Sequence, residues 1–167
     1  MKKKIMIGLM AGMLAVILST GWCAGNYSKV GFDLMKNETV GLLRIGASDV
    51  DVLRLMGSAQ TKSEATIWGA DGLEHQKWNY PAKGIELGMV RDGVMQTVDR
   101  ITIKSPCGWT TKRAIGIGAT EQEVRDAYKE EINPNAEGLV AGTIYGGIIF
   151  RLKDGFVSSI FIGASAE

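Results

Sequence analysis

The sequence TVGLLRIGASDVDV at residues 39–52 returns in altered form at residues 111–124, which read TKRAIGIGATEQEV. Aligned end to end, the two stretches share the residues Ile-Gly-Ala followed by Ser or Thr, with an acid three residues further on. Two related stretches in one chain predict an internal duplication, in which two structural units have the same design.

Both stretches carry the signature of a helix N-terminus. Ser48 and Thr120 are residue types that cap helices, and an acid three residues later, Asp51 or Glu123, stands where it completes a capping box. Apolar residues then recur at helical spacing, and Gly57 is well placed to end the first helix. We therefore expect a short helix at the start of each unit.

Alternating apolar residues, separated by short turn sequences, follow each predicted helix. Turns such as Arg91-Asp92-Gly93 are short enough to connect only antiparallel neighbours. The predicted strands are Ala65–Trp68, Leu73–Tyr80, Ile85–Val90 and Val98–Ile103 in the first unit, and Leu139–Tyr145, Ile148–Leu152 and Val157–Ile162 in the second.

These elements predict an α+β protein of two tandem units, each a short helical segment packed on an antiparallel β-meander. The first unit is residues 39–105 and the second is residues 106–167, with a linker at Pro106–Trp109. Residues 26–38 form an N-terminal segment before the first unit.

The first 25 residues have the composition of a signal peptide. Lysines at positions 2–4 precede an apolar run at residues 5–18, and small residues suited to cleavage follow. Cleavage after Gly21 and cleavage after Gly25 both fit the pattern. We therefore predict an exported protein, periplasmic or extracellular. An uncleaved N-terminus or lipidation of Cys23 would instead hold the protein at a membrane.

Net charge and cysteine content bear on nucleic-acid binding and on disulfide formation. The formal net charge is +1, and −2 without the three leading lysines, so we expect no binding to nucleic acid, which needs clustered basic residues. The two cysteines, Cys23 and Cys107, form a bridge only if Cys23 stays in the mature chain. Otherwise Cys107 is a lone, inert thiol.

No catalytic or metal-binding constellation is visible in the sequence. His75 is the single histidine, without cysteines or carboxylates at ligand spacing, and there is no Gly-x-Ser-x-Gly elbow. We predict a protein that is not an enzyme and needs no metal or cofactor, with His75 as a solvated strand residue. Trp78 and Tyr80 are either core or, with His75, a face that stacks a small ligand. Tyr145 falls at the place of Tyr80 in the second unit, which suits a core role.

The repeated Ile-Gly-Ala-Ser/Thr-x-x-Asp/Glu-Val pattern resembles a known superfamily when the strand motifs are added. These motifs are Trp78-x-Tyr80, the turn at Gly84-Ile85, and the closing Val98-x-x-Ile101-x-Ile103. Together they are similar to the β-lactamase-inhibitor-protein-like domains, a group that includes small envelope-assembly lipoproteins of the SmpA/OmlA (BamE) type. The resemblance implies tandem helix-plus-sheet units and a non-enzymatic role in binding other proteins. It assigns no individual binding residue.

The predicted outward faces of the two units differ in polarity. If Trp78 and Tyr80 point inward, the outer face of the first unit is polar, with His75, Lys77, Asn79, Glu86, Arg100 and Thr102. The outer face of the second unit is mainly apolar, with Val140, Ile144, Ile149, Arg151 and Phe161. An apolar face needs a cover. That cover is the strand-like segment Val30–Leu34, the other unit, or a partner.

The function predicted from the sequence is therefore an exported, non-catalytic module that binds a protein through its sheet surface. Its partner-binding residues are Val140, Ile144, Ile149, Arg151 and Phe161, and a second copy of the chain is one candidate partner. Two alternatives stay open: a membrane-anchored structural component of the envelope, and a binder of small ligands or cell-wall fragments.

Overall fold

The computed structural model describes residues 26–165, and these form an α+β protein dominated by one antiparallel sheet. The predicted α+β class is therefore confirmed. The helices are α1 (Tyr27–Asn37), α2 (Asp49–Met56), α3 (Glu121–Ala127) and a 3-10 turn, η1 (Pro81–Lys83). The strands are β1 (Thr61–Lys62), β2 (Thr66–Ile67), β3 (Glu74–Tyr80), β4 (Ile85–Asp92), β5 (Met95–Lys104), β6 (Leu139–Thr143), β7 (Gly146–Lys153) and β8 (Phe156–Gly163).

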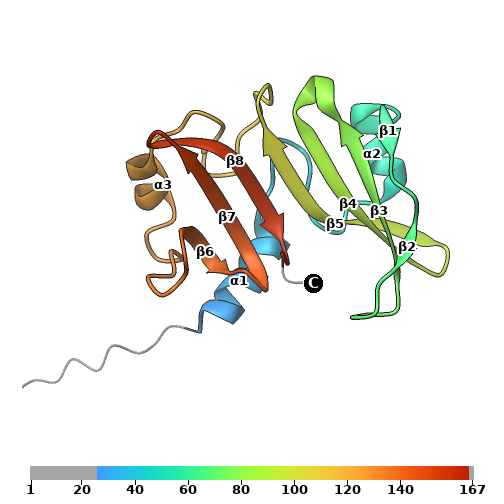
Figure 1. The fold of residues 1–167 in the computed structure, drawn as a ribbon, viewed down its shortest axis with the longest axis horizontal. Helices are drawn as coiled ribbons and strands as arrows, with labels where there is room; N and C mark the ends of the chain where they lie inside the picture. The colour runs from blue at the N-terminus through green and yellow to red at the C-terminus, as the bar shows by residue number, and fades with distance from the viewer. Residues whose placement is uncertain (1–25, 166–167) are drawn as a thin grey trace, which may run out of the picture.

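Two meanders, β3-β4-β5 and β6-β7-β8, join along one seam to make a single sheet. The strand order is β1-β3-β4-β5-β8-β7-β6, and β2 also pairs with β3 (Figure 1). At the seam the last strand of one meander pairs with the last strand of the other, so that Ile101 lies opposite Ile162 and Ile103 opposite Ile160. The sheet surface therefore runs without a break from β3 to β6.

α2 and α3 begin with the predicted caps. The Ser48 hydroxyl accepts a hydrogen bond from the Asp51 N–H at 3.1 Å, and the Thr120 hydroxyl accepts one from the Glu123 N–H at 3.2 Å. Only the second cap is a complete capping box, because the Glu123 carboxylate also accepts a hydrogen bond from the Thr120 N–H at 2.6 Å.

The turn before each of these helices is tied to the last strand of a meander. The Gly46 N–H donates to the Val98 carbonyl at 2.7 Å, and the Gly118 N–H donates to the Val157 carbonyl at 2.8 Å. The same two strand residues donate back, to the residue that follows each glycine. These paired hydrogen bonds fix where each helix enters relative to its meander.

One face of the sheet carries the hydrophobic core. Each helix contributes to it, with Leu34 from α1, Val52 from α2 and Val124 from α3. The strands complete the core with alternate side chains that are at most 4% exposed: Trp78, Tyr80, Ile85, Leu87, Met89, Ile148, Phe150, Ile160 and Ile162. The inward alternation predicted for β3, β4, β7 and β8 is confirmed at these positions.

The segment Val30–Leu34, one of the three covers considered for the apolar outer face, is not a strand over that face. It belongs to α1, which lies against β6 and β7 on the core side and passes behind β7 in Figure 1. The side chain of Asn26 accepts a hydrogen bond from the Lys29 N–H at 3.1 Å and so starts the helix. Apolar residues at 30 and 34 satisfy helical spacing as well as alternation, and this cap favours the helix.

The turn between β6 and β7 shows that a second prediction, a strand continuing to Tyr145, is wrong. β6 ends at Thr143, so Ile144 and Tyr145 lie in the turn instead of continuing the strand. Tyr145 is 66% exposed, whereas Tyr80 is 1% exposed, and the two tyrosines therefore do not occupy equivalent places. The chain reverses directly into Gly146 and Gly147, which leaves no strand position for residues 144 and 145.

The predicted signal peptide at residues 1–25, with Cys23, lies outside the described residues. Cys107, in the linker between the meanders, is a buried free thiol. Within residues 26–165, no helix has the length and apolar character needed to cross a membrane.

Candidate functional site on the open face of the sheet

The face of the sheet opposite the core is called the open face below. One row of side chains crosses it in register over six neighbouring strands: Asn79, Glu86, Thr102, Phe161, Ile149 and Val140. The row changes from polar to apolar at the β5–β8 seam. Because α1, α2 and α3 all pack on the core side, none of them covers it.

A groove of about 260 Å³ lies on the open face across the seam. Ile149 and Phe161 provide its apolar surface, and both are partly exposed. Its charged residues are three cations and one carboxylate, namely Lys77, Arg100, Arg151 and Glu86. The groove therefore combines an apolar floor with charged and polar walls.

Three of the five predicted partner-binding residues meet in this groove. Ile149, Arg151 and Phe161 line it, and Arg151 is exposed. Val140 lies at the end of the same row but is only 1% exposed, so it is not available as a contact. Ile144 lies in the β6–β7 turn and does not line the groove.

A bulge in β5 places two charged side chains on the open face. Gly88 pairs with Arg100 but Met89 pairs with Val98, so Asp99 is an extra residue in β5. A Cβ atom on Gly88 would lie 2.3 Å from Asp99 Oδ1 and 2.7 Å from Arg100 Nε. Both side chains therefore lie over Gly88, and only a glycine leaves room for them.

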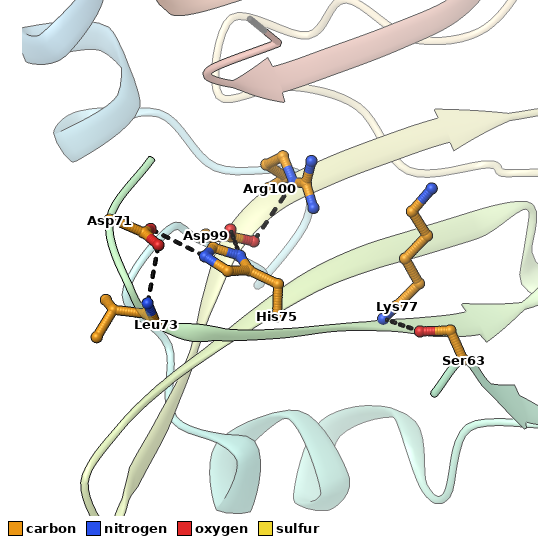
Figure 2. A network of polar contacts seen from close by, with 7 residues as sticks. All are labelled: Ser63, Asp71, Leu73, His75, Lys77, Asp99 and Arg100. Atoms are coloured by element: carbon orange, nitrogen blue, oxygen red, sulfur yellow. Dashed lines mark hydrogen bonds and ion pairs between the residues drawn. The ribbon is translucent and has the colours of Figure 1, made fainter. Parts of the chain in front are cut away.

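The prediction that His75 is a solvated strand residue is wrong, because its side chain is buried between two carboxylates. Its side chain is 5% exposed, with Nε2 at 2.9 Å from Asp71 Oδ2 and Nδ1 at 3.0 Å from Asp99 Oδ2 (Figure 2). The imidazole also stacks on the ring of Trp68, with 3.7 Å between the ring centroids. The sequence did not reveal these partners, because Asp71 lies in the loop before β3 and Asp99 lies on β5, two strands away from His75 in the sheet.

Each ring nitrogen of His75 faces one carboxylate oxygen, and these two contacts fix the orientation of the ring. The pKa of Asp71 is lowered, first by a hydrogen bond from the Leu73 N–H and then by His75, which keeps this carboxylate ionised. Both nitrogens are thus occupied, and His75 acts as a clamp between the loop before β3 and the bulge.

A second hollow, of about 310 Å³, adjoins the groove and shares Lys77 and Arg100 with it. Trp68 and His75 form part of its wall, and the Arg100 guanidinium lies 4.3 Å from the centre of the Trp68 ring. Arg100 Nε is also 3.6 Å from Asp99 Oδ1. Figure 2 shows the side chains of Lys77 and Arg100 pointing to the side away from α2.

Trp78 and Tyr80 do not form a ligand face with His75. Both point into the core, on the side of β3 opposite to His75, and are at most 2% exposed. The Trp78 indole N–H donates to Gln76 at 2.7 Å, and the Tyr80 hydroxyl donates to the Gly57 carbonyl at 3.1 Å. Burial raises the pKa of Tyr80. The core interpretation of these two residues is therefore correct.

A buried carboxylate on the core side, that of Glu38, was not anticipated from the sequence. Glu38 is 4% exposed and accepts hydrogen bonds from the N–H groups of Thr39 and Lys112 and from the Tyr128 hydroxyl at 2.9 Å. Arg113 lies over the Tyr128 ring. A cavity of about 540 Å³ opens beside this cluster. Because both oxygens of the Glu38 carboxylate accept hydrogen bonds, this residue has a structural role in joining the end of α1 to Lys112 and to Tyr128.

Two further findings concern metal binding and similarity to known proteins. Residues 26–165 contain no group of three or more His, Cys, Asp or Glu side chains placed to hold a metal ion. No family model, curated protein or solved structure matches the chain. The resemblance to β-lactamase-inhibitor-protein-like domains therefore stays a prediction.

Proposed function

We propose that this chain is an exported, non-catalytic protein-binding module whose open sheet face docks its partner. The observation that carries the proposal is the groove across the β5–β8 seam, which none of the three helices covers. Partly exposed Phe161 and Ile149 lie there beside Arg151. Aromatic and aliphatic anchors with an arginine are the mixture typical of the centre of protein interfaces.

The proposal includes a tandem organisation, with units at residues 39–105 and 106–167. It is supported by the paired hydrogen bonds that tie each helix entry to the last strand of its meander. A bulge in each of these strands adds support, since Asp99 is the extra residue in β5 and Ser158 is the extra residue in β8. Equivalent irregularities at equivalent places are what an internal duplication leaves behind.

Export and the absence of catalysis are also parts of the proposal. Export rests on the predicted signal peptide at residues 1–25. A non-catalytic role is supported by His75, whose two nitrogens already face carboxylates, and by the burial of Cys107. The alternative of a small-ligand face loses support because Trp78 and Tyr80 are buried in the core.

The proposed function is tested by co-purification from the native envelope with variants of the open face. Ile149→Asp and Phe161→Asp place a charge where an apolar partner surface would pack, and both are expected to lose a partner that the wild type retains. Val94→Asp is the matched control, because Val94 is 94% exposed at the β4–β5 hairpin tip, away from the groove. It should retain the partner.

The thermal unfolding midpoint of each variant shows whether a lost partner reflects the altered surface or a loss of folding. The proposal requires that the open-face variants keep the midpoint of the wild type, since the side chains are partly exposed already. Unfolding of both variants would mean that this face is part of the core. Retention of the partner by folded variants would place the binding surface elsewhere.

A further inference from the structure

We propose that the loop at residues 68–73 is a pH-sensitive latch, which His75 holds against the sheet when its ring carries two protons and releases when it carries one. The inference goes beyond the proposed docking function and does not depend on it. It follows from the burial of His75, from the two carboxylates that its nitrogens face, and from the way the loop is attached to the sheet.

The loop at residues 68–73, between β2 and β3, is hydrogen-bonded within itself. The Trp68 N–H donates to the Leu73 carbonyl at 3.0 Å, and the Leu73 N–H donates to Asp71 Oδ1 at 2.9 Å. Two of its side chains, Asp71 and Trp68, reach the sheet, and both of them meet the ring of His75. The position of the loop therefore depends on this imidazole.

The charges around His75 come from every element packed against it. They belong to Asp71 of the loop, Glu64 before β2, Lys77 of β3, and Asp99 and Arg100 of β5. β4 presents Val90 opposite His75, and its Arg91 pairs with Glu74 on the other face of the sheet. Three carboxylates and two cations thus surround the ring, and a second proton on the imidazole balances their charge.

The number of protons on His75 decides how many of its two contacts are hydrogen bonds. An ionised carboxylate only accepts hydrogen bonds, whereas an imidazole has two N–H groups with two protons and one N–H group with one. Loss of a proton therefore leaves a nitrogen lone pair facing a carboxylate oxygen. Histidine is the side chain whose charge ordinarily changes between about pH 5 and 8.

The contact with Asp71 is the one expected to break. Asp99 lies within β5 and its side chain is 21% exposed, whereas Asp71 lies in the loop and its side chain is 40% exposed. The carboxylate in the loop can turn to water at less cost, so the remaining N–H is expected to stay on Nδ1, facing Asp99. The loop then moves away from β3 together with Trp68, which forms part of the wall of the second hollow.

The experiment follows His75 and Trp68 in the same samples by NMR between about pH 5 and pH 9, the range in which histidine titrates. The chain has one histidine, so its ring signal is unambiguous in untagged protein. Incorporation of 5-fluorotryptophan gives each tryptophan a fluorine signal, and the signal of Trp68 is identified by its loss in Trp68→Phe. The Trp68 signal should shift with the same midpoint as the ring signal of His75. The signals of Trp78 and Trp109 should not follow it.

Asp71→Asn should reverse the direction of the pH dependence. In the wild type Asp71 Oδ1 accepts the hydrogen bond from the Leu73 N–H, and Oδ2 faces His75 Nε2. If the amide oxygen of the variant keeps the bond with Leu73, its NH2 group faces His75 and can only donate. That arrangement suits the ring with one proton, so the loop should be held at high pH and released at low pH.

Glu74→Gln is the matched control, because it makes the same chemical change on the other face of β3. It should show the pH dependence of the wild type. A Trp68 signal that stays constant while His75 titrates overturns the latch, and so does a midpoint that differs from that of His75. A shift in the same direction in Asp71→Asn as in the wild type also overturns it. If Asp71→Asn does not fold, the two midpoints in the wild type still decide the question.

Discussion

At the scale of single residues, His75 determines how the loop before β3 is held against β5. Its two nitrogens join Asp71, at the end of that loop, to Asp99 in the β5 bulge, and its ring covers Trp68. Hydrogen bonds to charged groups contribute more than neutral ones, and a partly buried carboxylate left without its donor is costly. His75 therefore stabilises the surroundings of Arg100.

His75→Ala should lower the free energy of unfolding by about 2 kcal/mol, because two charge-assisted hydrogen bonds and a ring stack are lost. Urea denaturation at neutral pH measures the change. Lys77→Ala, on the same face of β3 but exposed, is the control and should change the stability little. Equal losses of unfolding free energy in the two variants would show that the contacts of His75 contribute nothing to stability.

At the scale of the elements, the start of α3 depends on the charge of one carboxylate. The pKa of Glu123 is lowered from its ordinary value of 4.5, first by the hydrogen bond from the Thr120 backbone N–H and then by that from its hydroxyl. A carboxyl with a lowered folded-state pKa contributes stability above its unfolded-state pKa, and loses it as the pH falls through the folded-state value.

Glu123→Gln should therefore be less stable than the wild type at neutral pH, and the difference should shrink as the pH falls below about 4.5, where Glu123 becomes protonated. Denaturation curves at a series of pH values measure this convergence. Glu130→Gln is a suitable control, since Glu130 is exposed and outside the capping box. A difference between Glu123→Gln and the wild type that stays constant with pH would contradict the prediction.

At the scale of the whole molecule, the seam makes two meanders into one body. Ile103 and Ile160 face each other across β5 and β8, and neither is exposed. The buried residues of both meanders belong to one continuous core cluster. We therefore expect the two meanders to unfold together, although each has its own helix and its own turns.

Ile103→Ala should lower the free energy of unfolding by about 3 kcal/mol, because a buried side chain is removed from a packed core. Hydrogen exchange of amides in β4 and in β7 should lose protection to the same extent. Ile67→Ala, at an exposed position in β2, should leave both unchanged. Loss of protection in β4 alone would mean that the meanders unfold as separate bodies.

Local patterns in the sequence predicted most of the elements and the inward faces of β3, β4, β7 and β8. Both helix caps are where Ser48 and Thr120 indicated, and Ile149 and Phe161 share the open face as their alternation predicted. The α1 helix was mistaken for a strand because Val30 and Leu34 satisfy both periods. The partners of His75 escaped prediction, since Asp99 meets His75 across β4 and local sequence patterns do not contain the pairing of strands.

The residues alone settled the features that depend on near neighbours: the caps, the turns, the alternation of the strands and the contrast between a polar and an apolar outer face. Folding in three dimensions settled the pairing of β5 with β8, the side on which α1 packs, and the clamp around His75. These contacts join residues far apart in the chain, such as Ile103 with Ile160. Which segments come into contact depends on the burial and hydrogen bonding of the whole sheet. Local propensities do not include that free energy.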